Sequence, residues 1–323
     1  MIVTDWAAIS PFGVSTADFA TGVRSGAPAG DGPRTVPDFD ARELLGKQAS
    51  LSMTRSAALA AATCARLAAE DDVPARTGLV LATTTGSVQS ILDVTRVSLT
   101  GKKPYRIPPS TILGAAINSA AGQTAIRHAL KGPNTTLAAG RPSGLVALGY
   151  ARRLLDAGRA DTVIAGGVEE DSEARSRIDR LCGGKAPLVE GCAMLRLART
   201  GPGLAEVVAV ASLVAADGDS ATAVRRAVGR VLAPGTPVWA ALTSGTTGDP
   251  EFTVVADLCR PDVMLPAVTE TLGESHAVSA TFQLAAVLSH AAADPAAGRL
   301  ALVTSVDPGG AVAAALLRLG AGR

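Results

Sequence analysis

The chain has 323 residues, a net charge of +1 and a hydrophobic content of 47 %. A chain of this length and apolar content can bury a large core, and its near-neutral charge excludes the strongly basic surface of a nucleic-acid-binding protein. No apolar run reaches about 18 residues and the first residues are unlike a secretion signal, so we expect a cytoplasmic protein without a membrane segment.

Short apolar runs alternate with helical patterns along the chain, which predicts stacked βα units around buried sheets. Strands are predicted at 2–9, 77–83, 135–138, 162–165, 193–197, 205–214, 237–243, 300–305 and 311–317. Helices are predicted at 53–70, 87–99, 111–129, 142–157, 221–232 and 276–290. The segment 252–258 fits either a helix or a strand. The pattern favours an α/β protein.

One strand-to-helix turn is the most informative part of the sequence. The strand at 135–138 is followed by Gly140, which allows a sharp turn, and by Pro142, which suits the first position of a helix. A nucleophile on such a turn would be close to backbone N–H donors, and a thiol there would have a lowered pKa. The residue on this turn is Arg141, which stays protonated and carries no nucleophilic lone pair at neutral pH.

The surrounding stretch resembles the nucleophile region of the β-ketoacyl synthases, of the thiolase superfamily. The family pattern is Gly-Pro-Asn, a strand, a cysteine before Ser-Gly, a helix, and a strand that ends in Ala-Gly-Gly-x-Glu-Glu. The matching residues are Gly132, Pro133, Asn134, Ser143, Gly144, Ala165, Gly166, Gly167, Glu169 and Glu170. The resemblance places Arg141 at the cysteine. It implies one thiolase-like unit over residues 1–323, with α-β-α-β-α layers and two similar halves near 1–200 and 201–323.

The resemblance fails at the other catalytic positions of the family. Two family histidines assist malonyl decarboxylation and hold the developing oxyanion. The first is absent near Thr243, the second falls on His276, and a family lysine falls on Thr271. The family's gating phenylalanine falls on Val306 or Asp307. We therefore expect no catalytic residues and interpret His276 as a satisfied histidine, although it could still polarise a carbonyl group.

The positive charge of Arg141 lies at the start of a predicted helix. A cation at a helix N-terminus is disfavoured by the helix macrodipole by roughly 0.3–1 kcal/mol. A carboxylate such as Glu169 or Asp249 could compensate by pairing with Arg141, or an anionic group could bind to it. In the alternative interpretation, the side chain points to solvent. A long side chain that points inward would keep acyl chains out of the pocket.

The resemblance also implies a tunnel wall and a subunit interface. The tunnel candidates lie on one face of the helix at 87–99, and they are Val88, Ile91, Leu92 and Thr95. The alternative is an ordinary amphipathic helix that packs on its own core. The interface candidates form the strand expected to pair across the dimer, and they are Thr135, Thr136, Leu137 and Ala138.

Among ketosynthase-like proteins, the chain is most similar to the chain-length factors of type II polyketide synthases. The resemblance implies a non-catalytic subunit that forms a heterodimer with an active ketosynthase, meets an acyl carrier protein through that complex and shapes the acyl tunnel. Those subunits carry glutamine at the cysteine position, so Arg141 is a departure. No cofactor, metal ion or nucleic acid is expected.

Two alternatives remain open. The chain could be an acyltransferase or decarboxylase of the same fold with another nucleophile, for which Ser143, Ser244 and Thr246 are candidates by residue type. It could also be a homodimeric scaffold. The four cysteines have no CxxC spacing and are expected to be buried, reduced thiols.

Overall fold

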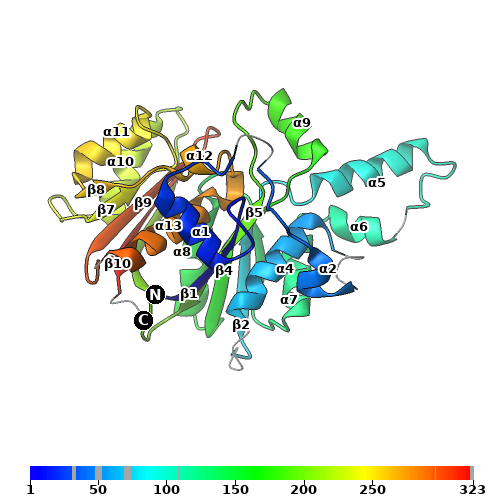
Figure 1. The fold of residues 1–323 in the computed structure, drawn as a ribbon, viewed down its shortest axis with the longest axis horizontal. Helices are drawn as coiled ribbons and strands as arrows, with labels where there is room; N and C mark the ends of the chain where they lie inside the picture. Colours follow the sequence, from blue (N-terminus) through cyan, green and yellow to red (C-terminus); the bar gives the residue numbers. More distant parts are fainter. Residues whose placement is uncertain (31–33, 48–52, 69–73, 108, 295, 321–323) are drawn as a thin grey trace.

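The computed structural model describes residues 1–30, 34–47, 53–68, 74–107, 109–294 and 296–320 (Figure 1). Its strands are β1 (Ile2–Ile9), β2 (Thr77–Ala82), β3 (Asn134–Leu137), β4 (Thr162–Glu169), β5 (Gly191–Ala198), β6 (Ala205–Val214), β7 (Ala240–Leu242), β8 (Val263–Met264), β9 (Leu300–Val306) and β10 (Ala311–Leu319). Its helices are α1 (Thr16–Ser25), α2 (Ala41–Leu45), α4 (Arg55–Leu67), α5 (Val88–Thr100), α6 (Pro109–Ala115), α7 (Ser119–Arg127), α8 (Ser143–Asp156), α9 (Glu173–Leu181), α10 (Ser220–Val231), α11 (Pro250–Cys259), α12 (Val268–Thr271), the 3-10 turn η1 (His276–Val278) and α13 (Ser279–Ala293).

The strand order reveals two similar halves. The described strands form a mixed sheet in the order β3-β2-β4-β5-β1-β6-β10-β9-β7-β8. Read from its far edge, the second half has the order β8-β7-β9-β10-β6, which repeats β3-β2-β4-β5-β1 of the first half. The parallel and antiparallel pairings repeat in the same places. β1 and β6 join the halves through only the pairs Ile2–Glu206 and Val3–Ala205.

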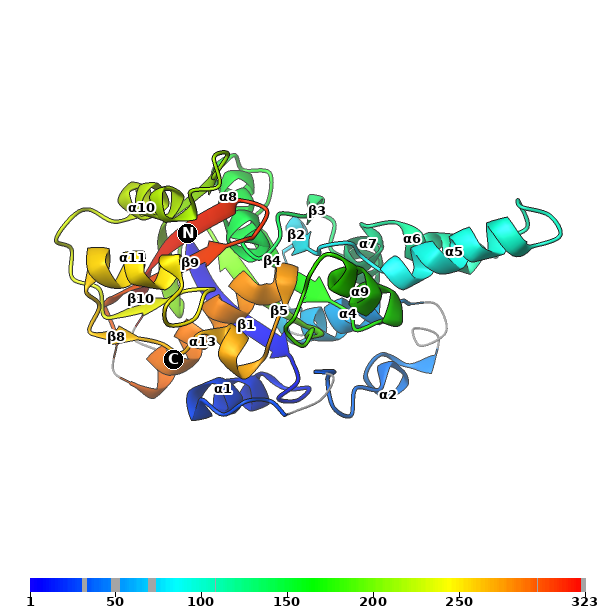
Figure 2. The ribbon, with the colours of Figure 1, turned by 90° about the horizontal axis from the view of Figure 1, so that it is seen from above.

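The core has the layered arrangement that the sequence predicts. One apolar cluster joins α8 and α13 to both halves of the sheet and includes Val163 of β4 and Val303 of β9. Successive strand residues point to opposite faces. Accordingly, Ile164 packs with α4 and α7, and Leu302 packs with α10 and α11. Figures 1 and 2 show these two helix pairs well apart, with α10 and α11 at the left and α4 and α7 right of the centre. The α-β-α-β-α order is therefore confirmed.

Several predicted elements differ from the observed ones. The predicted helix at 111–129 is divided into α6 and α7, and the predicted helix at 276–290 begins as η1. The ambiguous segment 252–258 lies in α11, which has Pro250 at its start. Of the predicted helix at 53–70, residues 69 and 70 lie outside the described residues. Helix α9 was not predicted, because most of its residues are charged and only Ala174, Ile178 and Leu181 are apolar.

Helix α5 extends away from the body of the protein, with α6 beside it (Figures 1 and 2). Exposed apolar side chains gather on these helices and the segments next to them, and they are Ile91, Leu92, Leu99, Tyr105, Ile112, Leu113 and Ile117. Of the predicted face of α5, only Val88 is buried. The alternative that this face packs on the chain's own core is therefore wrong for the residues after Val88. An exposed apolar surface of this kind marks an interaction site. Among the described residues, no helix is both long and apolar enough to cross a membrane.

Candidate functional site

The turn between β3 and α8 is built by the residues that the sequence singled out. Gly140 has φ +65°, and a Cβ atom at this position would lie 1.9 Å from Oδ2 of Asp307. The Ser143 hydroxyl donates to the Gly140 carbonyl (2.6 Å) and accepts from the Ala139 N–H (2.8 Å). Ser143 is fully buried. Its hydroxyl therefore fixes the turn and is not free to act as a nucleophile.

Arg141 on this turn is ion-paired with Glu274, which precedes η1. The Arg141 Nε donates to both carboxylate oxygens of Glu274, at 2.9 and 3.2 Å, and its Nη2 donates to Oε2. The two side chains are 26 % and 10 % exposed, respectively. A fork-like contact between a guanidinium and a carboxylate is among the strongest hydrogen-bonded pairs in proteins. The contact joins two segments that are 133 residues apart in sequence.

The electrostatics of the pair favour both charges. Burial acts to raise the pKa of Glu274, but hydrogen bonding and attraction to Arg141 lower it below its ordinary value of 4.5. Burial likewise acts to lower the pKa of Arg141, but hydrogen bonding to Glu274 outweighs this effect and raises it. Asp307 and Glu251 raise it further. Arg141 is therefore a firmly charged group.

The lowered pKa of Glu274 predicts a pH dependence. A carboxyl group whose pKa is lower in the folded protein stabilises the fold above its unfolded pKa, and this contribution is lost as the pH falls through the folded pKa. We therefore expect the native chain to be more stable than E274Q at pH 7, and this difference to shrink below about pH 4.5. Urea unfolding at both pH values measures it. E206Q is the control, because Glu206 forms only an exposed ion pair with Arg318. A difference that stays constant with pH would contradict the prediction.

The backbone of Arg141 is engaged as well. Its N–H donates to Oδ2 of Asp307 at 3.0 Å. The same carboxylate accepts from the Gly309 N–H through Oδ1 at 2.8 Å, within the tight turn between β9 and β10. A backbone N–H on such a strand-to-helix turn is a donor suited to an oxyanion. In this chain, Asp307 occupies it.

His276 is held by α9. Its Nδ1 lies 3.2 Å from Nη2 of Arg175, and its Nε2 lies 3.4 Å from Oδ1 of Asp179. Since arginine can only donate, Nδ1 accepts and the ring proton lies on Nε2, which faces Asp179. The backbone of His276 is left-handed, with φ +42°, and its N–H donates to Glu274. Both ring nitrogens are thus engaged, so the imidazole anchors α9.

A cleft of about 780 Å³ contains these groups. Its lining includes Arg141, Glu274, His276, Asp307 and Lys185. A neighbouring cavity of about 200 Å³ shares His276 with the cleft and is bordered by Val88 at the start of α5. The structure therefore brings together the predicted positions Arg141 and His276, and places one tunnel candidate beside them.

The other tunnel candidates point elsewhere. Ile91 and Leu92 are each 39 % exposed on the projecting part of α5, and Thr95 is exposed one turn further along. They border solvent in the single chain. A tunnel lined by all four residues would need a second protein surface against α5, and it stays a prediction.

The predicted partners of Arg141 were wrong. Glu169 lies at the end of β4, accepts from the Thr84 N–H and faces Arg175 at 3.6 Å. Asp249 accepts from Thr246 before α11. Both carboxylates bind these other groups, and neither of them contacts Arg141. The sequence also missed Arg175 and Asp179, because the helix that carries them was not predicted.

The remaining substituted positions do not face the cleft as reactive groups. The Thr243 hydroxyl donates to the Gly245 carbonyl, and the Thr271 hydroxyl donates to the Val268 carbonyl. Both residues are buried. Local carbonyl groups thus satisfy both side chains.

The other candidate nucleophiles are also engaged. Ser244 is buried, and its hydroxyl donates to Glu251 at 2.6 Å and accepts from the Val306 N–H. Thr246 donates to Asp249 at 3.3 Å. Both hydroxyls therefore help to shape the loop before α11.

Three of the four cysteines are buried, and the fourth borders the cleft. Cys64, Cys192 and Cys259 are buried, and burial raises the pKa of Cys64 and Cys192 to about 12 and that of Cys259 to about 11. Cys182 follows α9, is exposed and borders the cleft. All four are free cysteines, as predicted, but the prediction that all are buried is wrong for Cys182.

The interface candidates lie at an edge of the sheet. β3 pairs with β2 and ends the strand order on that side. Thr135, Thr136 and Leu137 are half-buried, and Ala138 is exposed. Leu137 also borders a cavity of about 580 Å³ with α8 and β6. An edge strand presents backbone groups with which another chain can pair, and the interface itself stays a prediction.

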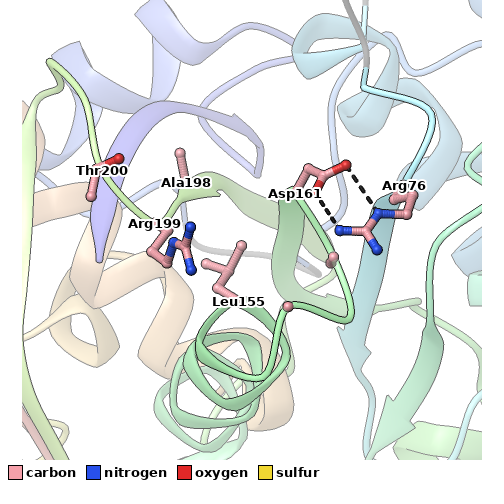
Figure 3. A pocket seen from close by; sticks show the side chains of 8 residues that line it. Arg76, Leu155, Asp161, Ala198, Arg199 and Thr200 are labelled. Carbon is pink, nitrogen blue, oxygen red and sulfur yellow. Dashed lines mark hydrogen bonds and ion pairs between the residues drawn. The ribbon is translucent and has the colours of Figure 1, made fainter.

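A separate pocket lies where β2 and β4 begin (Figure 3). There Arg76 and Asp161 form an exposed ion pair, and hydrogen bonding to Arg76 is the largest cause that lowers the pKa of Asp161. Arg199 lies nearby on the same pocket. An exposed pair of this kind contributes little to stability because solvent screens its charges. The pocket has no link to the cleft around Arg141.

Comparisons with known proteins agree with this geometry. Residues 17–214 match the family model of the β-ketoacyl synthase N-terminal domain. Because the match covers more than half of the chain, the chain belongs to the β-ketoacyl synthase family, and the predicted membership is confirmed. In a solved structure, the ishigamide ketosynthase/chain length factor, one chain is 38 % identical and superposes with a TM-score of 0.92 over 99 % of both chains.

More distant relatives support the fold and parts of the sequence. The AntDE:AntF complex, a ketosynthase with its acyl-carrier protein, contains a chain with a TM-score of 0.80 and 15 % identity over 98 % of this chain and 99 % of that one, which shows the fold alone. A 3-oxoacyl-[acyl-carrier-protein] synthase 2 from Rhizobium meliloti is 40 % identical over 31 % of this chain and 23 % of its own length. One from Synechocystis is 30 % identical over 52 % and 45 %, respectively. The chain thus matches less than half the length of these curated relatives.

Proposed function

We propose that this chain is a non-catalytic subunit that pairs with an active ketosynthase in a type II polyketide synthase and shapes the acyl tunnel. The observation that carries the proposal is the turn before α8, where Arg141 is bound to Glu274 and no nucleophile is present. The likeness to a ketosynthase/chain length factor over 99 % of both chains supports it. Ketosynthase chemistry would then come from the partner.

The engaged hydroxyls weigh against catalysis by another nucleophile. Ser143 fixes its own turn, Ser244 is buried on Glu251, and Thr246 caps a loop. A nucleophilic hydroxyl needs an adjacent general base and access to the substrate. Ser143 and Ser244 are buried, and Thr246 is not among the residues that line the cleft, so the cleft is better suited to a structural role.

Two surfaces of the chain suit a partner. The apolar residues on α5 and α6 leave an exposed patch, and the edge of β3 offers unpaired backbone groups. A ketosynthase that covers both would place a wall against Ile91 and Leu92 and close a tunnel that starts near Val88. Chain length would follow from the volume of that shared cavity.

Co-expression with a ketosynthase from the same source organism tests the pairing. We expect a one-to-one complex by size-exclusion chromatography with mass determination, and poor behaviour of the chain alone because its apolar patch is exposed. A well-behaved homodimer that ignores the ketosynthase would contradict the proposal and favour a scaffold. Mass spectrometry of the single chain with an acyl thioester is the companion measurement. A covalent acyl adduct there would favour an enzyme with another nucleophile.

A further inference from the structure

Two carboxylates of this chain sit where a carboxylate ligand of the cleft would bind. Glu274 fills the guanidinium fork of Arg141, and Asp307 accepts from the backbone N–H of the same residue. They come from different loops, before η1 and after β9, and they converge on one residue. Between them they satisfy Nε, Nη2 and the backbone N–H of Arg141.

The cleft has the room and the charge for an anion once these groups are removed. It measures about 780 Å³, and Lys185 lines it together with Arg141. The Arg141 side chain is 26 % exposed, so the cleft reaches it. A guanidinium and a backbone N–H are together a strong receptor for a carboxylate.

We propose that Glu274 and Asp307 are built-in occupants of an anion-binding site, an autoinhibitory contact that keeps carboxylate ligands out of this cleft. The lost nucleophile is thereby joined to a second obstacle to an acidic substrate, since Nε, Nη2 and the backbone N–H of Arg141 already bind carboxylates. The inference rests on the proposed non-catalytic role of the cleft. It is tested by comparing variants of this chain in one and the same purified form, alone or with the ketosynthase, so its failure would leave the pairing proposal standing.

Isothermal titration with malonate tests the proposal on the double variant E274Q/D307N. Glutamine and asparagine keep the shape and one acceptor oxygen of each side chain, and they remove the negative charges. Because hydrogen bonds to charged groups are strong, we expect malonate to bind this variant about ten- to a hundredfold more tightly than the native chain. Adding R141Q should abolish the gain. E206Q, which changes a surface glutamate, should bind malonate like the native chain.

Each outcome is decisive. The proposal is overturned if the native chain binds malonate as tightly as the folded double variant, or if the double variant gains no affinity. It is also overturned if the gain survives R141Q, because the site would then lie elsewhere. If circular dichroism shows that the double variant is unfolded, E274Q alone decides in the same way, since Asp307 and its turn remain intact in it.

Discussion

Replacing Arg175 by alanine is expected to lower the free energy of unfolding by about 3–5 kcal/mol, because it leaves a buried carboxylate without its cation. Arg175 is 5 % exposed and faces Glu169, which is fully buried, at 3.6 Å. Its Nη1 also donates to the carbonyl groups of Glu170 and Val189, and its Nη2 donates to His276. One side chain therefore ties α9 to the end of β4 and to the floor of the cleft.

Urea unfolding of R175A measures this loss, with R318A as the matched control. Arg318 also pairs with a glutamate, but both side chains are about half exposed, so its removal should cost at most about 1 kcal/mol. Hydrogen exchange should in addition show faster exchange of the amides of α9 in R175A. If the two substitutions lower the free energy of unfolding equally, burial of the Arg175–Glu169 pair adds nothing to its contribution, and the prediction is wrong.

The layered fold was predictable because it depends on local patterns. Apolar runs of strand length, such as 77–83 and 300–305, alternate with helical patterns, and the turn around Gly140 carries its own residue signature. Each signal lies within a few residues of the element that it predicts. The order of the layers then follows from the need to bury both faces of each half-sheet.

The chemistry around Arg141 was only half predictable. The lost nucleophile is visible in a single position, but its counter-ion depends on which of 29 acidic residues the fold brings close. Glu274 lies 133 residues away, and its place depends on the loop that precedes η1. Glu169 and Asp249 were nearer to the family motifs, yet Glu169 is bound by the unpredicted helix α9 through Arg175.

The second large effect is expected at the edge of β3, where T136P should abolish the proposed complex with a ketosynthase. The Leu79 N–H donates to the Pro133 carbonyl and the Thr83 N–H to the Leu137 carbonyl, so alternate residues of β3 face β2. Thr136 lies between these positions, and its backbone groups face the open edge. Proline there removes one N–H from the edge and leaves the pairing with β2 intact.

M264P is the matched control for T136P, because it makes the same change at the other edge of the sheet. Val263 and Leu265 donate to β7, so the backbone groups of Met264 face outward in the same way. When an added strand supplies main-chain hydrogen bonds, their loss weakens binding strongly. We expect T136P to lower the affinity for the ketosynthase about a hundredfold or more and M264P to leave it unchanged, with both variants folded. Size-exclusion chromatography and titration with the ketosynthase measure these affinities. If T136P binds with full affinity, the prediction is wrong, and α5 and α6 are the remaining candidates for the interface.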